Sequence, residues 1–469
     1  MDIMCSLVRR FMIHASLGLV LASCWSGRVL AQAELQTLDL GKSVARGLAA
    51  NPQMQSAREV LIGSEKGKLA ALAAMGPVAK ASYSASHQDK DPFTLATEPV
   101  TAPVGNTNVP LGLSYTRVQT GYRDTFNLDI NIHQNLFTGF KLLSTYQKAA
   151  LSKDQAQAQL KNAELTLVRT VQQAFLGLLK ARADLKASED SKLRLESQVK
   201  TSQAYFQLGL VPRLDVLQAQ TDLDRVEQQI FASQGNIRVA EAQMNALLAF
   251  PMHVPIEYAG SLEYIPFSIP LESCLDSAYK NRPDMYVAIK SVEIAGKDTK
   301  IAAAPFYPQV AADADVIRTG NKWNVSGDNR FVFDYAYTQF TLSVSMQMWD
   351  WGNTLFSTQQ AQANTRKLQA DLASLRLTIR SSVQNFFFTM QQAGQRIGKA
   401  REGQKNAREA YAMATNRYKL QVGSYTDVLD AQSRMTNAES DMNQALYDYD
   451  TSLSNLYAAM GVLSPALRP

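Results

Sequence analysis

The chain has 469 residues, enough for several domains or one large architecture. With 46% hydrophobic and 19% charged residues and a slightly negative mean hydropathy, it is neither disordered nor a bundle of membrane-spanning helices. No stretch after residue 33 reaches the roughly 18–20 unbroken apolar residues that a spanning helix needs. The net charge of +5 is too small and too dispersed to predict binding of nucleic acid.

Residues 1–33 have the features of an export signal, since two arginines precede an apolar segment that ends in Ala31-Gln32-Ala33, a small-x-small cleavage pattern. A competing interpretation uses residues 21–24 (LASC), which resemble a lipoprotein box and would leave a lipidated Cys24. We favour cleavage after Ala33, because sequence typical of a folded domain begins directly behind it. Both routes take the protein out of the cytoplasm. The segment carries three arginines and one aspartate, so its removal lowers the net charge from +5 to +3.

Residue types that would build a catalytic or metal site are sparse. After cleavage at Ala33 only Cys274 remains of three cysteines, which excludes an internal disulfide and predicts a small buried apolar residue. The three remaining histidines are widely separated, and Gly41-Lys42-Ser43 lacks the upstream glycine of a phosphate-binding loop. We therefore predict no metal, no cofactor and no enzymatic activity.

The two halves of the chain share one order of features. The phrase D-V-L-x-A-Q begins at Asp215 in the first half and again at Asp427 in the second. A proline-rich stretch, residues 251–270, lies between the halves. These observations predict an internal duplication, with a first unit over 34–250, a linker over 251–270, a second unit over 271–461 and a tail over 462–469.

Each unit is predicted to contain very long helices. Apolar and small residues recur at alternating spacings of three and four residues over 160–185 and over 431–459, which is typical of coiled-coil packing. If the segment from Gly139 to Leu208 is helical throughout, it is about 100 Å long at about 1.5 Å per residue. That length exceeds the diameter of an ordinary globular domain.

Alternation of apolar and polar residues with a period of two predicts four strands, with polar exposed loops between the members of each pair. The strands are expected over 81–88, 126–137, 307–317 and 331–349, and the loops over 89–125 and 318–330.

One face of the stronger strands is apolar and the other is polar, as in an outer-membrane barrel that meets lipid outside and water inside. A soluble sandwich would show the same alternation, but the export signal and the lack of further strands favour the barrel. Four strands cannot close a membrane barrel, which needs about eight, so the chain is expected to oligomerise. The residues predicted to face the lumen are Asn127, Asp129, Asn131, Thr341, Ser343 and Ser345.

These features together resemble the TolC family of outer-membrane channel-tunnels. The most specific matches are Gly209-Leu210-Val211 with Asp215-Val216, and Val422-Gly423 with Asp427-Val428-Leu429-Asp430. The resemblance implies a mainly α-helical homotrimer in which each chain gives four strands to a twelve-stranded barrel, continued by a long α-helical barrel in the periplasm. It also implies drug efflux or type I protein secretion, with a periplasmic adaptor and an inner-membrane transporter as partners.

The resemblance places the two repeated phrases at helix–turn–helix tips at the periplasmic end of the tunnel. Gly209 and Gly423 would relax the turns, and Pro212 would end the incoming helix. Asp215 and Asp427 would begin the next helix, where an acid caps backbone amides and complements the helix dipole.

Asp430 has no counterpart in the first phrase and shares a helix face with Asp427. The resemblance implies that three chains form two rings of carboxylates there, a periplasmic gate that attracts cations. The alternative is that both acids only begin a solvated helix. Some family members hold the tips shut with an arginine in the second tip, but Ser424-Tyr425-Thr426 contains no base, and Arg213 of the first tip could instead pair with Asp427 or Asp430.

The sequence therefore supports two functions of different kinds. The first is a passive exit duct in the outer membrane that serves a tripartite efflux pump or a type I secretion system. The second is a periplasmic coiled-coil scaffold or adaptor without a pore, whose strands form a soluble sandwich.

Overall fold

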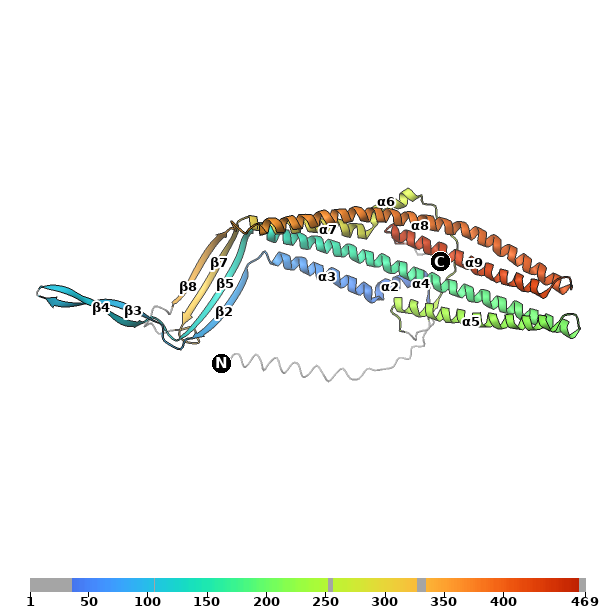
Figure 1. Cartoon of the computed structure of the whole chain (residues 1–469), viewed down its shortest axis with the longest axis horizontal. Helices are drawn as coiled ribbons and strands as arrows, with labels where there is room; N and C mark the ends of the chain where they lie inside the picture. The colour runs from blue at the N-terminus through green and yellow to red at the C-terminus, as the bar shows by residue number, and fades with distance from the viewer. Residues whose placement is uncertain (1–35, 105, 252–255, 327–334, 464–469) are drawn as a thin grey trace.

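The computed structural model describes residues 36–104, 106–251, 256–326 and 335–463. Figure 1 shows an elongated, mainly helical molecule with a β-sheet at one end of a long helical body and a separate hairpin beyond the sheet. The predicted signal segment with Cys24, and residues 464–469 of the predicted tail, lie outside the described residues.

Helices of nearly equal length follow one another in the same order in the two halves. The first half contains α2 (Leu40–Ala50, 11 residues), α3 (Pro52–Ala73, 22), α4 (Lys141–Gln207, 67) and α5 (Arg213–Leu247, 35). The second half contains α6 (Leu271–Asn281, 11), α7 (Pro283–Ala303, 21), α8 (Asn353–Lys419, 67) and α9 (Tyr425–Ala459, 35). At about 1.5 Å per residue, α4 and α8 are each about 100 Å long, which confirms the prediction of very long helices.

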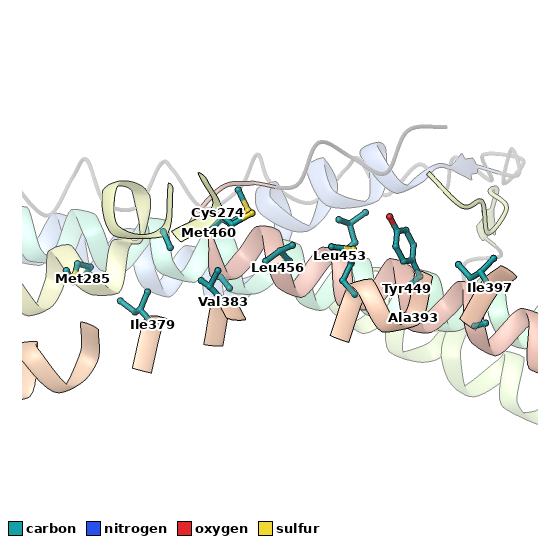
Figure 2. Packing of buried hydrophobic residues seen from close by; sticks show 14 residues of the cluster. Cys274, Met285, Ile379, Val383, Ala393, Ile397, Tyr449, Leu453, Leu456 and Met460 are labelled. Atoms are coloured by element: carbon teal, nitrogen blue, oxygen red, sulfur yellow. The ribbon is translucent and has the colours of Figure 1, made fainter. Parts of the chain in front are cut away.

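The helices pack side by side in two successive rows. Near the sheet the order is α3, α4, α7, α8, and farther from it α5 and α9 take the places of α3 and α7 (Figure 1). Each half has its own hydrophobic core, and Figure 2 shows the core of the second half, formed by α6, α7, α8 and α9. Cys274 is fully buried in this core, as predicted.

Four strands form one antiparallel sheet in the order β2 (Val78–His87), β5 (Asp124–Thr138), β7 (Gln309–Gly320) and β8 (Tyr335–Ser345). The four predicted strands are thus present, with shifted ends. The predicted loop 318–330 begins too early because β7 continues to Gly320, and the described part of β8 ends at Ser345 rather than at residue 349. The outer edges of β2 and β8 pair with no other strand in the described part of the chain.

The prediction that residues 89–125 form a loop is wrong. They contain β3 (Phe93–Val104) and β4 (Thr107–Gln119), which form a two-stranded antiparallel hairpin. The prolines in this segment are typical of loops, but each strand of a two-stranded ribbon has a free edge, where a missing N–H is tolerated. Two three-residue strands, β1 (Gln36–Leu38) and β6 (Ile256–Tyr258), were also not predicted, and β6 lies within the predicted linker 251–270.

The chain passes from sheet to helix through two residues of left-handed backbone at each junction. Between β5 and α4 these are Gly139 (φ 60°) and Phe140 (φ 67°), and between β8 and α8 they are Trp351 (φ 54°) and Gly352 (φ 82°). The chain therefore turns from strand into helix within a few residues and continues away from the sheet, so the long helices start directly at its end (Figure 1). A Cβ atom at Gly139 would lie 2.3 Å from the carbonyl oxygen of Ala304, in the short helix η1 (Ala304–Phe306).

Candidate functional site

The turns between α4 and α5 and between α8 and α9 lie at the end of the molecule away from the sheet (Figure 1). Both helices end in the same motif, in which the Leu210 amide donates to the Tyr205 carbonyl and the Val422 amide donates to the Arg417 carbonyl, each at 2.9 Å. The left-handed residue of this motif is Gly209 (φ 74°) in the first tip. In the second tip it is Gln421 (φ 61°), which holds the equivalent position in the repeated pattern.

Two predicted roles in the tips are therefore wrong. Gly423 does not have the positive φ, and its hydrogen leaves space for Arg417, since a Cβ atom would lie 3.0 Å from the Arg417 Cβ. Pro212 does not end α4, which stops at Gln207, and instead precedes the first residue of α5. Its fixed φ suits a position at the start of a helix.

A small hydrophobic cluster joins the two tips. It contains Val199, Ala219, Tyr418, Tyr425 and Val428, with Tyr425 almost fully buried. The hydroxyls of Ser202 and Tyr418 lie 3.2 Å apart within it. The two helical hairpins are thus packed together at their ends rather than separate.

Asp215 and Asp427 both lie in the first turn of a helix, as predicted, but in different surroundings. Burial raises the pKa of Asp215. Asp427 forms a reciprocal capping box, in which its carboxylate accepts from the Ser424 amide and its amide donates to the Ser424 hydroxyl, each at 3.1 Å. These bonds lower the pKa of Asp427, so this carboxylate is charged at neutral pH.

Asp430 points away from this cap. Its carboxylate lies 3.5 Å from the guanidinium of Arg434, one turn further along α9, and both side chains are exposed. An exposed ion pair of this kind contributes little to the free energy of unfolding, so stability does not require the Asp430 carboxylate. Arg213 has no ion pair with Asp427 or Asp430 within the described single chain, and such a contact between neighbouring copies stays a prediction.

Polar contacts join α4 to α9 along their length and thereby link the two helical hairpins. The Asn443 amide donates to Asp184 at 3.0 Å, and the ion pair of Arg194 with Glu439, at 3.2 Å, is largely buried. Breaking a buried pair is far more costly than breaking an exposed one. These contacts therefore fix α9 in one position against α4.

Asp450, in the same helix α9, is only 4% exposed, and burial raises its pKa to about 7. Because an aspartate in an unfolded chain has a pKa of about 3.9, the folded state binds the proton more tightly. Stability is therefore expected to fall as pH rises from about 4 to about 7, by up to about 1.4 kcal/mol per pH unit. Asp450→Asn should remove this loss, so its guanidinium midpoint should exceed that of the native protein at about pH 8 and approach it at about pH 5.

Asp441→Asn serves as the control, because Asp441 is an exposed acid of the same helix. It should leave the pH dependence of the midpoint unchanged. If Asp450→Asn and Asp441→Asn show the same pH dependence, burial of Asp450 does not control stability in this range.

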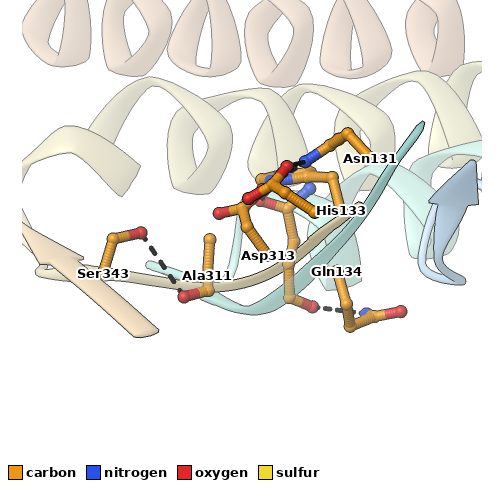
Figure 3. A network of polar contacts seen from close by, with 8 residues as sticks. Asn131, His133, Gln134, Ala311, Asp313 and Ser343 are labelled. Carbon is orange, nitrogen blue, oxygen red and sulfur yellow. Dashed lines mark hydrogen bonds and ion pairs between the residues drawn. The ribbon is translucent and has the colours of Figure 1, made fainter. Parts of the chain in front are cut away.

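Most polar side chains of the sheet lie on one face, where several of them bind one another (Figure 3). The Asn131 amide donates to Asp315 at 2.6 Å, and His133 Nδ1 lies 2.8 Å from the Asp313 carboxylate. Asp313 and Asp315 are not among the predicted lumen-facing residues, although the A-D-A-D alternation of β7 puts both on one face. By strand register the residues predicted to face the lumen share this face, namely Asn127, Asp129, Asn131, Thr341, Ser343 and Ser345.

The opposite face of the sheet is apolar and open to solvent in the single chain. On β8, Phe340 is 83% exposed, and Leu342 and Val344 are each 67% exposed. Ile130 and Ile132 of β5 are exposed on the same face, whereas their polar neighbours Asn131 and His133 are half-buried. This distribution is the reverse of that in a soluble sheet, whose apolar face would be covered.

Aromatic residues gather near both ends of the sheet. At the helical end, Phe137 and Phe140 are in edge contact with ring centroids 5.2 Å apart, and Trp349 and Trp351 at 5.7 Å. At the far end the Tyr83 hydroxyl donates to the Trp323 carbonyl at 2.7 Å. Aromatic girdles at two levels are typical of proteins that meet the two interfaces of a bilayer.

None of the helices in the described residues is both long and apolar enough to cross a membrane. Over the same residues no three His, Cys, Asp or Glu side chains are grouped so that they could hold a metal ion.

Comparisons with known proteins agree with this architecture. The family model described as outer membrane efflux protein matches residues 44–249 and 274–462. The outer membrane efflux protein BepC of Brucella suis is 21% identical over 288 residues, which cover 61% of this chain and 60% of the length of BepC. The match covers less than two thirds of that relative.

Solved structures show the same fold at low sequence identity. The CmeC outer membrane channel of Campylobacter jejuni has a TM-score of 0.74 at 16% identity, covering 90% of this chain and 85% of that one. The outer membrane protein VceC of Vibrio cholerae has a TM-score of 0.72 at 18% identity, covering 90% and 96%. Because the family model matches most of the sequence, the chain belongs to the outer membrane efflux protein family, a family of outer-membrane channels rather than of enzymes.

Proposed function

We propose that three copies of the chain form a channel through the outer membrane, with a twelve-stranded β-barrel continued by an α-helical barrel in the periplasm. The observation that carries this proposal is the sheet with its exposed apolar face, its half-buried polar face and its two unpaired edges within the described residues. Lipid would cover the apolar face, and the polar face would line a water-filled lumen. Neighbouring copies would pair with the edges of β2 and β8, which removes every open edge of the four-stranded sheet.

The helical body supports the same assembly. The helices at the ends of the two rows, α3, α5 and α8, expose large apolar side chains that have no cover in the single chain. Neighbouring copies would bury these surfaces by joining α8 of one chain to α3 and α5 of the next. The exposed residues include Ile62 and Leu69 on α3, Phe231 and Val239 on α5, and Leu377 and Phe388 on α8.

We also propose that the chain consists of two copies of one unit, over 34–250 and 271–461. The support is the match of helix lengths, 11, 22, 67 and 35 residues against 11, 21, 67 and 35. Each chain then supplies two similar helical hairpins, α4–α5 and α8–α9, to the tunnel. Three chains therefore give six similar hairpins around the axis.

Within the channel, the polar face of the sheet lines the outlet and the tips form the periplasmic gate. Asp427 and Asp430 of three chains would ring the narrowest point, where charged carboxylates attract cations and repel anions. Family membership supports a role as the exit duct of a tripartite efflux pump or a type I secretion system. In that role the tips would meet a periplasmic adaptor and an inner-membrane transporter.

The competing function is a periplasmic scaffold without a pore. It requires a soluble protein, and the exposed apolar sheet face argues against that. Native mass spectrometry of the detergent-purified protein is expected to show three chains per particle. A monomer that stays in solution without detergent would remove the channel proposal and favour the scaffold.

A further inference from the structure

The β3–β4 hairpin, residues 93–119, takes no part in the channel described above. Its strands pair only with each other in the described part of the chain, and it extends beyond the end of the sheet that faces away from the helices (Figure 1). A two-stranded hairpin is at best marginally stable in water without a further packing partner. Its length and isolation therefore call for a surface that covers it.

The base of the hairpin is fixed to the sheet and sets where it stands. The Gln88 amide donates to the Arg123 carbonyl and the Thr120 amide to the Pro92 carbonyl, each at 2.8 Å. The Arg123 guanidinium also pairs with the Asp91 carboxylate at 3.2 Å. The hairpin is thus a continuation of the β2–β5 ribbon and not a loose loop.

One face of the hairpin carries an apolar stripe. Strand register places Phe93, Leu95, Pro99, Leu113 and Tyr115 on this face, and Leu113 and Tyr115 are 60% and 66% exposed. The same face also carries Thr97 and Arg117. The opposite face carries mostly small or polar side chains, for example Ala96 paired with Thr116 and Glu98 paired with Ser114, together with Val100 and Val118. The hairpin is therefore amphipathic, with its apolar face uncovered in the single chain.

The charge of the hairpin and its distance from the membrane limit what could cover the apolar stripe. Residues 93–119 contain only two charges, Glu98 and Arg117, and the Arg117 guanidinium lies 4.1 Å from the centroid of the Phe93 ring, so the hairpin offers little to a charged partner. Lipid is out of reach as well. The strands of the sheet, with 10 to 15 residues at about 3.4 Å each, already span the roughly 25 Å apolar band of an outer-membrane barrel, and the hairpin lies beyond them.

We propose that the apolar stripes of three β3–β4 hairpins pack against one another around the threefold axis and form a collar over the extracellular mouth of the channel. The inference rests on the proposed trimer, which places three identical hairpins around the mouth. A contact repeated about a threefold axis closes on itself. The one charge on the stripe face, Arg117, lies at the base of the hairpin over the Phe93 ring, so Pro99, Leu113 and Tyr115 nearer the tip are left to make the contact.

Cysteine cross-linking of the full chain in detergent tests the collar. Leu113→Cys lies on the apolar stripe and Thr116→Cys on the opposite face of the same strand, while Cys274 is buried and does not interfere. A short bis-maleimide is expected to join Leu113→Cys chains into covalent dimers in most particles. Thr116→Cys is expected to give about one tenth of that yield or less, because opposite faces of a strand do not share neighbours.

The trimer itself is monitored on the same samples by native mass spectrometry. If the particle contains three chains but the two cysteine variants cross-link equally, or neither does, the collar is wrong while the channel proposal stands. If the particle is not a trimer, both fail. Stronger quenching by brominated lipid in Tyr115→Trp than in the native protein, whose Trp349 and Trp351 serve as the reference, would also overturn the collar, since it would place the stripe in the membrane.

Discussion

Gly139→Ala is expected to prevent assembly of the folded protein. The residue has φ 60°, and left-handed backbone costs an alanine about 1–2 kcal/mol relative to glycine. The added methyl group would lie 2.3 Å from the Ala304 carbonyl oxygen and 3.0 Å from the Tyr307 Cβ. Such overpacking costs about 1–3 kcal/mol more. The yield of trimer after extraction, and its guanidinium midpoint, measure the effect.

Gly177→Ala is the matched control. Gly177 lies in the interior of α4, and a Cβ atom there would meet nothing within 4 Å. Alanine has the higher helix propensity by about 1 kcal/mol, so this variant should be as stable as the native protein or more so. If Gly139→Ala behaves like Gly177→Ala, the junction between β5 and α4 does not require the close approach to Ala304.

Asp427→Asn combined with Asp430→Asn is expected to weaken block of the channel by hexaamminecobalt added from the periplasmic side by about tenfold or more. Tenfold corresponds to about 1.4 kcal/mol of binding free energy. The low pKa of Asp427 keeps it charged, and Asp430 is exposed with only Arg434 beside it. Asparagine keeps an oxygen that can accept from the Ser424 amide, so charge is lost while the cap persists.

Asp441→Asn removes one exposed acid from the same helix, about three turns beyond Asp430, and should leave block unchanged. Single-channel recordings of the three proteins separate the two interpretations of the tip acids. Unchanged block in the double variant would mean that Asp427 and Asp430 only start the helix.

The long helices could be predicted from the sequence because their apolar steps of three and four continue over many turns. The lengths of α4 and α8 follow from the distance between each sheet junction and the repeated phrase at Asp215 or Asp427. Periodicity of this kind is a local property, and it does not depend on which neighbour covers the apolar side. The four strands of the sheet were predicted for the same reason.

The hairpin 93–119 could not be predicted because its prolines are excluded only from strands with two neighbours. Pro99, Pro103 and Pro110 lie in strands that each keep one free edge, and the sequence does not show how many neighbours a strand will have. The strands β1 and β6 were missed because they pair between distant parts of the chain and are too short to show a period.

The similarity between the two repeated phrases predicts where the helices begin at the tips, but not the turns before them. Asp215 and Asp427 begin their helices as predicted, since an acid in a first turn has a local cause. The predicted role of Gly423 is wrong because Gly423 is not the equivalent of Gly209. Gly209 and Gln421 lie at the same distance before the repeated aspartate, and both have a positive φ. Hydrogen bonds of the motif and the buried Tyr418 and Tyr425 beside it hold Gln421 in a conformation that usually favours glycine.

In the proposed channel, three chains enclose a water-filled path across the outer membrane. Single-channel recording after insertion of the purified protein into planar lipid bilayers tests it most directly. Discrete, uniform conductance steps that favour cations are expected, because the polar face of the sheet carries three aspartates, Asp129, Asp313 and Asp315, against Lys80, and the tips carry Asp427 and Asp430. Absence of conductance from a protein shown to be an intact trimer in the bilayer would contradict the proposed channel.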